Sequence, residues 1–304
     1  MKKITSLNQP KFSENKVDQI RNEIKRELVP KIEEYVSNHK LFRDKEVNIS
    51  FAQEGSNSLV VIIETEDKKY VLKISVSKNP SEAEGTFLKV WEKDGVSVPK
   101  VIEEGLLNQR SFILMDFVKA DILGKAYSPE EMISRNIFVE LGSILSKMHL
   151  RSVKGYGFLR NGHPEFRDFS EWSSKLATSR FAYIKEYSIL NDEEHGSITK
   201  SIDIIEQYLV SDDRSTYCHN DFTLFNAFAT NPITIFDPSP AFAHPYIDLG
   251  LAIVLMVSMY EYDSDEVVRQ LIEGYFGSKT IDLQVLHAFV VFNSHGRIPR
   301  WHMT

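Results

Sequence analysis

The sequence predicts an α+β fold made of two lobes. Its 304 residues correspond to about two units, at roughly 150 residues per domain. Apolar, β-branched runs indicate strands between residues 51 and 116, whereas the chain after residue 119 follows helical periodicity. No segment repeats at the periods that are typical of solenoid proteins. A strand-rich half followed by a helix-rich half indicates two units of the α+β class.

The composition narrows the function classes. Acidic residues outnumber basic ones, 43 against 36, which argues against a general nucleic-acid binder because such proteins bind through cation–phosphate attraction. The longest apolar stretch, residues 249–260, is shorter than the ~20 residues of a membrane span. Cys218 is the only cysteine, so we expect no disulfide and a reducing compartment. Residues 1–10 lack the apolar segment of a secretory signal. We therefore expect a cytoplasmic protein with no nucleic-acid or membrane partner.

The strand-rich half begins with a helix and a hairpin. Apolar residues at three- and four-residue steps over 17–35 predict an amphipathic helix, which Pro30 should kink or split. Residues 59–63 and 70–74, joined by a polar turn, predict a β-hairpin. Because side chains alternate along a strand, Lys73 projects from the face opposite the apolar one. The other expected elements of this half are a helix over 81–93 and a strand over 112–115.

The helix-rich half opens on a clear start signal. Ser128 is a capping residue, Pro129 takes the first helical position, and Glu131 stands three residues after the cap. One apolar stripe follows, made of Ile137, Leu141, Leu145 and Met148. The later expected elements are helices over 172–187 and 198–209, a block of loop, hairpin and turn over 217–237, and further helices toward residue 304.

The sharpest motif is the segment from His219 to Asn226, which is His-Asn-Asp-Phe-Thr-Leu-Phe-Asn. It has the H-x-D-x-x-x-x-N spacing of a kinase catalytic loop. Phosphoryl transfer needs a hydroxyl that is held in line and a phosphate whose charge is neutralised. Asp221 is therefore a candidate to orient a hydroxyl and accept its proton. Asn226 is a candidate to bind magnesium.

Two further segments support this interpretation. Residues 234–237 form a short apolar run that ends in Asp237, where a second magnesium carboxylate belongs. The alternative for Asp237 is a turn cap before Pro238. Lys73 lies in a Tyr-Val-Leu-Lys-Ile strand that matches the V-A-I-K strand whose lysine grips phosphates. The alternative for Lys73 is a solvated residue at a sheet edge.

Candidate nucleotide-binding residues flank this lysine. The turn before the hairpin contains three small residues whose backbone N–H groups could face phosphate oxygens, Gly55, Ser56 and Asn57. The carboxylate partner of Lys73 is expected on the next helix, where Glu84 has the better spacing and Glu82 is the alternative. Either glutamate could instead be a plain surface charge.

Three more segments complete a family pattern. Residues 98–101 are Val-Pro-Lys-Val, residues 141–149 are Leu-Gly-Ser-Ile-Leu-Ser-Lys-Met-His, and residues 246–250 are Tyr-Ile-Asp-Leu-Gly. They are similar to the V-P-x-V, L-G-x-x-L-x-x-L-H and D-L-A elements of one family. With the catalytic loop, Lys73 and Asp237, they resemble the aminoglycoside phosphotransferase family, the small-molecule kinases of the protein-kinase-like fold. The resemblance covers about residues 47–253.

This resemblance implies a two-lobed protein-kinase-like fold with a small β-rich N-lobe and a larger helical C-lobe. It implies an N-terminal helical extension over residues 1–45, a nucleotide-binding N-lobe over 46–118 and a C-lobe over 119–304 that holds the catalytic loop and the acceptor site. The hinge, 115–118, would contact the adenine; its residues are Met115, Asp116 and Val118. His219 and Asp248 would support the catalytic loop. ATP or GTP would be the co-substrate and Mg²⁺ the cofactor.

Two departures bear on the substrate. Asn220 stands where regulated protein kinases carry Arg. Asp237 is followed by Pro-Ser, where those kinases have Phe-Gly, and no A-P-E triplet follows. These differences disfavour a protein kinase. Asp237 is followed by proline, whereas common antibiotic kinases have Asp-Trp or Asp-Phe at this place. The Asp-Pro pair also occurs in fructosamine and methylthioribose kinases. These departures concern the acceptor and leave the expected reaction unchanged.

An acidic cluster gives the remaining expectation about the acceptor. It lies after Tyr260 and includes Glu261, Asp263, Asp265 and Glu266. The resemblance implies that this region is part of the acceptor cleft, where carboxylates suit a cationic acceptor; the alternative is a solvated helix end. We expect an aminoglycoside antibiotic as the acceptor. The alternative is a metabolite, such as a sugar, fructosamine, methylthioribose or an amino alcohol, and a third hypothesis is a nucleotide-binding protein without catalysis.

Overall fold

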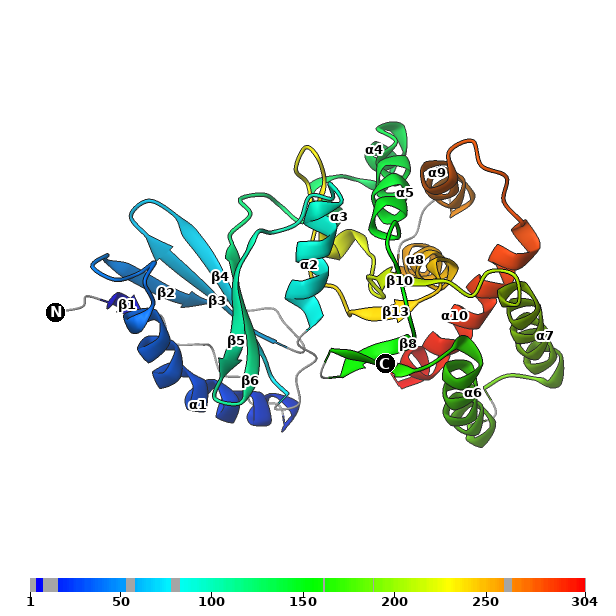
Figure 1. The fold of residues 1–304 in the computed structure, drawn as a ribbon, viewed down its shortest axis with the longest axis horizontal. Coiled ribbons are helices and arrows are strands. Elements are labelled where there is room, and N and C mark those ends of the chain that lie inside the picture. The colour runs from blue at the N-terminus through cyan, green and yellow to red at the C-terminus, as the bar shows by residue number, and fades with distance from the viewer. Residues whose placement is uncertain are drawn as a thin grey trace. The chain divides into compact units, whose positions relative to one another are not determined.

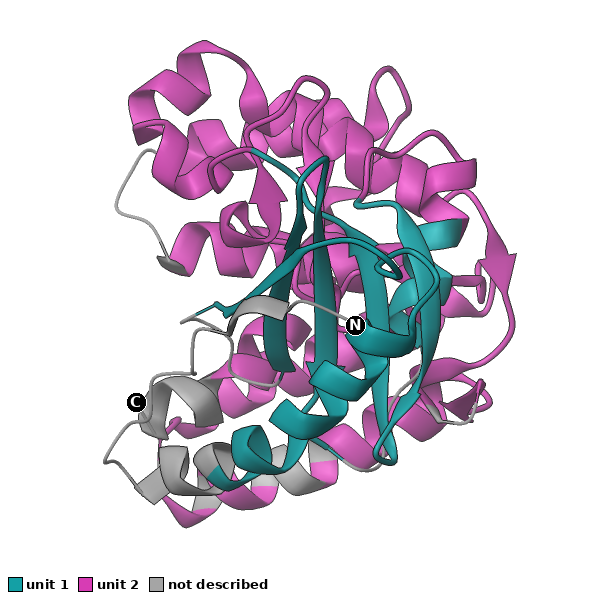
Figure 2. Ribbon diagram, turned by 90° about the vertical axis from the view of Figure 1, so that its left-hand side faces the viewer, with its two compact units in different colours: residues 1–89, 99–119 teal, residues 90–98, 120–304 magenta. Residues whose placement is uncertain are grey.

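The structure is a computed structural model that describes residues 4–7, 16–52, 58–77, 83–160, 162–187, 189–259 and 264–303. The chain divides into two compact units, unit 1 with Met1–Lys89 and Pro99–Lys119 and unit 2 with Val90–Val98 and Ala120–Thr304. Figure 1 shows the elements of each unit, and Figure 2 colours unit 1 teal and unit 2 magenta. None of the described helices combines the length and hydrophobicity that a bilayer crossing requires.

A mixed β-sheet forms the centre of unit 1. Within the described residues its strand order is β1-β2-β3-β4-β6-β5, with β1 parallel to β2 and the other neighbours antiparallel. The strands are β1 (Ile4–Leu7), β2 (Val47–Phe51), β3 (Ser58–Thr65), β4 (Lys69–Ser75), β5 (Val101–Leu107) and β6 (Arg110–Asp116). The helices are α1 (Lys16–Asn38) and α2 (Ala83–Lys93), and the last turn of α2 belongs to unit 2.

Helix α1 closes the core of unit 1. Leu28, Ile32 and Val36 follow one another at four-residue steps on one helix face, and they are buried in the same cluster as the inner face of the sheet. The expected split at Pro30 does not occur, because α1 runs as one helix through it. An interior proline costs about 3 kcal/mol. Burial of each large aliphatic side chain stabilises the folded state by about 1.5–3 kcal/mol, so the burial of these three side chains outweighs the cost of the proline.

The predicted hairpin is confirmed and sets the direction of Lys73. Strands β3 and β4 pair antiparallel, with Val60 opposite Lys73. Tyr70, Leu72 and Ile74 are buried, and the alternate positions of β4 are only partly so. Lys73 therefore leaves the sheet on the face away from the α1 core. The expected helix over 81–93 is α2 in its described part, and the expected strand over 112–115 lies within β6.

Unit 2 is mostly helical. Its described helices are α3 (Leu123–Ala126), α4 (Pro129–Ser134), α5 (Ile137–Met148), α6 (Phe169–Glu186), α7 (Asp192–Leu209), α8 (Pro245–Met259), α9 (Ser264–Phe276) and α10 (Leu283–Met303), with a 3-10 turn, η1 (Leu224–Asn226). A small sheet has the order β7-β10-β13-β8-β9, and β11 pairs with β12 alone. These strands are β7 (Ser152–Val153), β8 (Tyr156–Arg160), β9 (His163–Phe166), β10 (Ser215–Cys218), β11 (Ala227–Phe228), β12 (Thr234–Ile235) and β13 (Ala241–Ala243).

The start signal of this half is confirmed, and two helices, α4 and α5, follow it. The Ser128 hydroxyl accepts from the Glu131 backbone N–H, and the Glu131 carboxylate accepts from the Ser128 N–H at 2.8 Å. Helix α4 then ends at Ser134, and Asn136 has a φ of 55°, in the left-handed region that interrupts a helix. The apolar stripe belongs to α5, which starts at Ile137, and its four residues are buried there.

Glycines bring α5 and α9 into backbone contact. A Cβ on Gly142 would lie 2.2 Å from the Leu271 carbonyl oxygen, and one on Gly274 would lie 1.9 Å from the Val139 carbonyl oxygen. No side chain fits at either position without separating the helices. This close approach holds the first half of α5 against the last turns of α9.

Candidate active site

The candidate catalytic loop leaves the small sheet of unit 2 at the end of β10. Strand β10 pairs with β13 and β7, and the buried Cys218 is its last residue. His219 follows, and Asn220 has a φ of 55°, a conformation that costs free energy for a non-glycine residue. This left-handed residue turns the chain immediately before Asp221, and η1 then carries it to Asn226.

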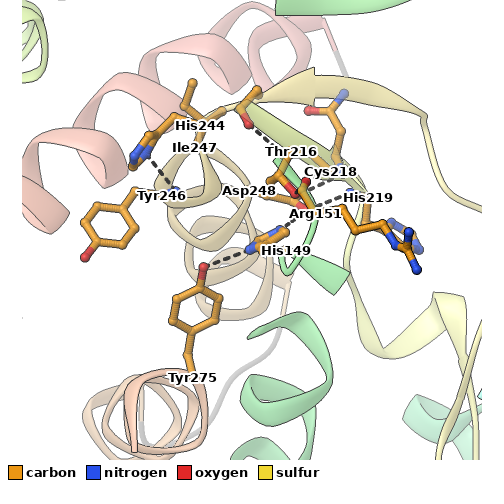
Figure 3. A network of polar contacts seen from close by, with 12 residues as sticks. His149, Arg151, Thr216, Cys218, His219, His244, Tyr246, Ile247, Asp248 and Tyr275 are labelled. Carbon is orange, nitrogen blue, oxygen red and sulfur yellow. Dashed lines mark hydrogen bonds and ion pairs between the residues drawn. The ribbon is translucent and has the colours of Figure 1, made fainter. Parts of the chain in front are cut away.

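One buried carboxylate holds this turn. Asp248, in the first turn of α8, is 1% exposed, and its Oδ2 accepts from the His219 backbone N–H at 2.6 Å while its Oδ1 accepts from the Asn220 N–H at 2.7 Å. His149 Nε2 lies 3.1 Å from the same Oδ2, and the Tyr275 hydroxyl lies 2.8 Å from His149 Nδ1 (Figure 3). Asp248 thus binds the backbone on the N-terminal side of Asp221, which is the geometry that loop support requires.

The His219 side chain links the loop to the segment before Asp237. Its Nε2–H donates to the Phe236 carbonyl oxygen at 3.0 Å, and the Ser239 N–H donates to the His219 carbonyl oxygen at 2.8 Å. Burial lowers the pKa of His219 although Asp248 and Asp221 act in the opposite direction, so its ring is neutral. Trp91 stacks on the ring at 5.9 Å between centroids. These contacts fix the ring and, through it, the spacing of the two segments.

Asp221 and Asn226 lie against each other. Asn226 Nδ2 donates to the Asp221 carbonyl oxygen at 2.8 Å and to Asp221 Oδ2 at 2.9 Å. The hairpin of β11 and β12 then returns the chain, and the Phe236 N–H donates to the Asn226 carbonyl oxygen at 3.0 Å. Asp237, the next residue, has a φ of 55°. The hairpin therefore returns the chain to Asn226 at Phe236, the residue immediately before Asp237.

This donor set suits a hard cation. The Asn226 amide nitrogen faces Asp221, which leaves Oδ1 as the oxygen that a cation would take, and the Asp237 carboxylate would be the second oxygen donor. Oxygen ligands from one amide and one carboxylate are what Mg²⁺ takes in proteins. A second group with potential ligands consists of His149, Cys218 and Asp248, whose atoms lie within 4.8 Å of one another. Burial raises the pKa of the Cys218 thiol, and Asp248 is already bonded to the loop, so this group is structural.

Unit 1 contains the candidate phosphate-binding pair. Lys73 Nζ donates to both carboxylate oxygens of Glu84, at 2.6 and 2.8 Å, and the two side chains are 13% and 15% exposed. Partly buried and paired in this way, the ammonium group keeps a fixed position. The alternative partner, Glu82, lies outside the described residues, as do Gly55, Ser56 and Asn57 of the expected phosphate-binding turn.

The expected hinge residues end strand β6 and begin the link that follows. Met115 is buried in β6, and Val118 is partly buried. The Asp116 N–H donates to the Lys100 carbonyl oxygen at 3.0 Å, and the Asp116 carboxylate pairs with Lys68 at 2.7 Å. Both the backbone N–H and the carboxylate of Asp116 therefore have partners within unit 1.

The acidic cluster is only partly within the described residues. Glu261 and Asp263 lie outside them. Asp265 is exposed in the first turn of α9. Glu266 pairs with Arg269 at 2.6 Å and accepts from the Gln270 amide at 2.9 Å, and these partners lower the pKa of Glu266 to about 2. The Glu266 carboxylate thus already has a cation from its own helix.

Two residues at the site were not expected from the sequence. Tyr275 of α9 contacts His149, and Arg297 of α10 has its guanidinium 3.8 Å from Asp221 Oδ1. His149 lies in the L-G-x-x-L-x-x-L-H segment, which is the sequence signal for its position. Neither Tyr275 nor Arg297 belongs to a short motif, so only the packing of α9 and α10 reveals them.

The chain has the parts of a phosphotransferase with a protein-kinase-like fold. These are an aspartate-bearing loop after a buried strand, an asparagine and a second aspartate joined by a hairpin, and a lysine–glutamate pair on a separate sheet. Comparison with known proteins agrees with this class. Residues 48–289 match the phosphotransferase enzyme family, and the chain belongs to that family.

Individual relatives are distant. A Staphylococcus aureus protein, described only as an uncharacterized protein in the ileS 3' region, is 32% identical over 119 residues, which is 38% of this chain and 76% of that protein. A choline/ethanolamine kinase family protein from Mesorhizobium loti gives a TM-score of 0.60 at 15% identity, over 91% of this chain and 87% of that chain. A thermostable mutant of aminoglycoside phosphotransferase APH(4)-Ia, in a ternary complex with AMP-PNP and hygromycin B, gives 0.59 at 14%, over 84% and 87%. The predicted α+β, protein-kinase-like fold is confirmed.

Proposed function

We propose that the chain transfers the γ-phosphoryl group of ATP or GTP to a hydroxyl group of a small molecule. The observation that carries the proposal is the constellation of Asp221, Asn226 and Asp237 around one hairpin, with Asp248 holding the loop. The acceptor oxygen forms a bond to the γ-phosphorus while the bond from that phosphorus to the β,γ-bridging oxygen breaks. The nucleoside diphosphate leaves with the electron pair, and the hydroxyl proton passes to the Asp221 carboxylate.

Unit 1 is proposed to bind the nucleotide. Lys73, held by Glu84 through two hydrogen bonds, supplies a positioned positive charge for phosphate oxygens. The backbone of Met115, Asp116 and Val118 is proposed to contact the base. The AMP-PNP in the complex of the hygromycin B relative supports a nucleotide co-substrate. A reducing compartment in which ATP is available, the cytoplasm, suits a chain with one buried cysteine.

Mg²⁺ fits the oxygen donors of Asn226 and Asp237, and when bound it neutralises phosphate charge. The chain's own residues do the remaining work. Asn226 Nδ2 holds Asp221 Oδ2 at 2.9 Å, which fixes the carboxylate plane. Asp248 holds the backbone N–H groups of His219 and Asn220, and the neutral His219 ring holds the carbonyl of Phe236. The Asp221 carboxylate, as the proton acceptor, is therefore already in position when a substrate hydroxyl reaches it. This avoids the free-energy cost of ordering the carboxylate during the reaction.

Two classes of small molecule are candidates for the acceptor. An aminoglycoside is supported by the APH(4)-Ia likeness and by the exposed Asp265. A metabolite with an alcohol group is supported by the likeness to a choline/ethanolamine kinase family protein. A purified-enzyme screen of both classes with ATP and GTP in parallel, and resistance tests in a susceptible host, separate them.

The variant Asp221→Asn tests the proposed role directly. Asparagine keeps the shape of the side chain but cannot accept the hydroxyl proton, and loss of such a group lowers rates by about 10²–10⁴-fold. We expect that loss in kcat with nucleotide binding retained. The control is Asp203→Asn, at an exposed position of α7, with unchanged kcat. Full turnover in Asp221→Asn would refute the assignment, and nucleotide binding without transfer in the wild type would favour a non-catalytic protein.

A further inference from the structure

A row of residues that carries two opposite charges crosses the sheet of unit 1. Lys73 of β4 and Glu104 of β5 both stand opposite Ile113 of β6, so the three residues follow one another across neighbouring strands. Residues that stand opposite one another in an antiparallel pair project from the same face of the sheet. Lys73 leaves the sheet on the face away from the α1 core, and Glu104 therefore does so as well.

Helix α2 pairs with both charged residues of this row. Glu84 accepts two hydrogen bonds from Lys73 Nζ, at 2.6 and 2.8 Å. Five residues later in the same helix, Lys89 donates to Glu104 Oε2 and forms an ion pair with it. All four residues belong to unit 1. The sheet thus presents a cation and an anion to α2, and the helix presents the opposite charge to each of them.

The Glu104 side chain also lies against the backbone of α2. Gly85, the residue after Glu84, is buried, and a Cβ at this position would lie 2.8 Å from Glu104 Cγ and closer still to the carboxylate. A side chain at position 85 would therefore have to displace the Glu104 carboxylate. Glycine is unfavourable in a helix interior compared with alanine, and the contact with Glu104 is the feature that requires it here.

These contacts fix the position of α2 over the row. A slide by one residue moves a helix by about 1.5 Å and turns it by about 100°. A shift of only about 1 Å takes the hydrogen bonds between Lys73 and Glu84 beyond the distance at which such bonds form. A displacement that brings Glu84 toward Glu104 is opposed by the repulsion of two carboxylates. The pair at Glu104 therefore holds α2 at the position where Glu84 meets Lys73.

We propose that Glu104 is a positioning residue for nucleotide binding: through Lys89 and Gly85 it holds α2 where Glu84 fixes the Lys73 ammonium group. The inference rests on the function proposed above, in which Lys73 binds phosphate oxygens. The side chains of Lys89 and Glu104 are 42% and 26% exposed, and an ion pair this accessible to water contributes little to global stability. Its loss therefore changes the surroundings of Lys73 more than the stability of the protein.

The test measures the Lys73 amine and the nucleotide separately. Acetylation with a limiting amount of sulfo-N-hydroxysuccinimide acetate, followed by mass spectrometry, gives the reactivity of Lys73 without nucleotide, relative to the exposed Lys31 of α1. Calorimetric titration gives the dissociation constants of Mg-AMP-PNP and Mg-GMP-PNP, and urea unfolding gives the stability. The matched control is Glu64→Gln, which removes an ion pair with Lys69 from the same sheet.

We expect Glu104→Gln to raise the reactivity of Lys73, and the dissociation constant of whichever analogue binds, by about 2- to 5-fold. This factor is equivalent to the free energy of an ion pair at this exposure. The reactivity of Lys31 and the urea midpoint should keep their wild-type values, which a general loosening of unit 1 would not spare. Lys89→Arg keeps the charge and should behave as the wild type, and Glu64→Gln should change none of these quantities.

Gly85→Ala tests the same contact from the side of the helix. Its methyl group displaces the Glu104 carboxylate, so in the otherwise wild-type chain it should raise the reactivity of Lys73 as Glu104→Gln does. In a Glu104→Ala background the carboxylate is absent, and Gly85→Ala should have little further effect. A disturbance of α2 that does not pass through Glu104 would act equally in both backgrounds.

The failure of this inference is distinguishable from the failure of the proposed function. Unchanged Lys73 reactivity in a folded Glu104→Gln, or equal effects of Gly85→Ala in the two backgrounds, overturns the role of Glu104 and leaves the phosphotransferase intact. A wild type that binds neither nucleotide analogue, with folding verified by circular dichroism, overturns the proposed nucleotide site and this inference with it.

Discussion

Replacing Asp248 by asparagine tests how far the catalytic loop depends on one buried carboxylate. The side chain is 1% exposed and accepts three polar contacts, from the backbone N–H groups of His219 and Asn220 and from His149 Nε2. An asparagine has the same shape but carries an NH₂ group on one side. Whichever way the amide turns, this NH₂ faces at least one N–H donor that had an acceptor before.

The structure gives the size of the effect. If the NH₂ replaces Oδ2, both the His219 N–H and His149 Nε2 lose their acceptor; if it replaces Oδ1, the Asn220 N–H does. A charge-assisted hydrogen bond contributes about 1.5–3 kcal/mol, and a buried donor left without a partner costs about 1–3 kcal/mol. We expect Asp248→Asn to lower the free energy of unfolding by about 3–5 kcal/mol. A shift of the loop by about 1 Å would lower kcat by about 100-fold as well.

Urea unfolding followed by circular dichroism measures the first quantity, and steady-state kinetics on the folded variant measures the second. Asp203→Asn, which removes an exposed carboxylate from α7, is the matched control and should change neither by more than the experimental error. A loss of less than about 1 kcal/mol in Asp248→Asn, within the range of surface substitutions, would show that these hydrogen bonds do not hold the loop.

Three further predictions concern the same unit. Tyr275→Phe removes the hydroxyl 2.8 Å from His149 Nδ1 and should lower the unfolding free energy by about 1–3 kcal/mol; an unchanged urea midpoint would contradict the contact. Gly274→Ala puts a Cβ 1.9 Å from a carbonyl oxygen of α5 and should cost about 3 kcal/mol, at the upper end of overpacking penalties; a melting temperature equal to that of the wild type would argue against the close helix approach. Burial lowers the pKa of His244 below its ordinary value of 6.5, against the opposing effect of Asp212, so the unfolded chain binds a proton near pH 6.5 that the folded chain does not. Stability should therefore fall as the pH drops below about 6.5, by up to about 1.4 kcal/mol per pH unit for this histidine, and His244→Gln should flatten that slope in urea titrations between about pH 5.5 and 7.5.

The parts of the site that the sequence predicted are those built by local interactions. Asp221 and Asn226 are five residues apart on one short loop that ends in the 3-10 turn η1, so both residues could be found from the order of the amino acids alone. The same holds for Lys73, because strand alternation sets its face, and for the helix start at Ser128, because its capping box spans four consecutive residues. In each case the determining contacts lie within a few residues of one another.

Longer-range packing decides two features of the helices. Pro30 does not split α1 because burial of Leu28, Ile32 and Val36 outweighs its cost, and that burial depends on a sheet formed later in the chain. The helix that begins after Ser128 ends at Ser134, and the left-handed backbone of Asn136 redirects the chain so that the apolar stripe lies on α5 alone. The helix propensities of the individual residues do not predict either effect.

The sequence by itself determined the reaction class, because phosphoryl transfer needs a few polar residues at short, fixed spacings along one loop, one hairpin and one strand. The tertiary structure alone decided what surrounds Asp221. Tyr275 meets His149 across 126 residues because two glycines let α9 touch α5, and Arg297 meets Asp221 because Asn293 anchors α10 on α8. Such contacts depend on how helices pack, and no periodicity or motif in the sequence encodes them.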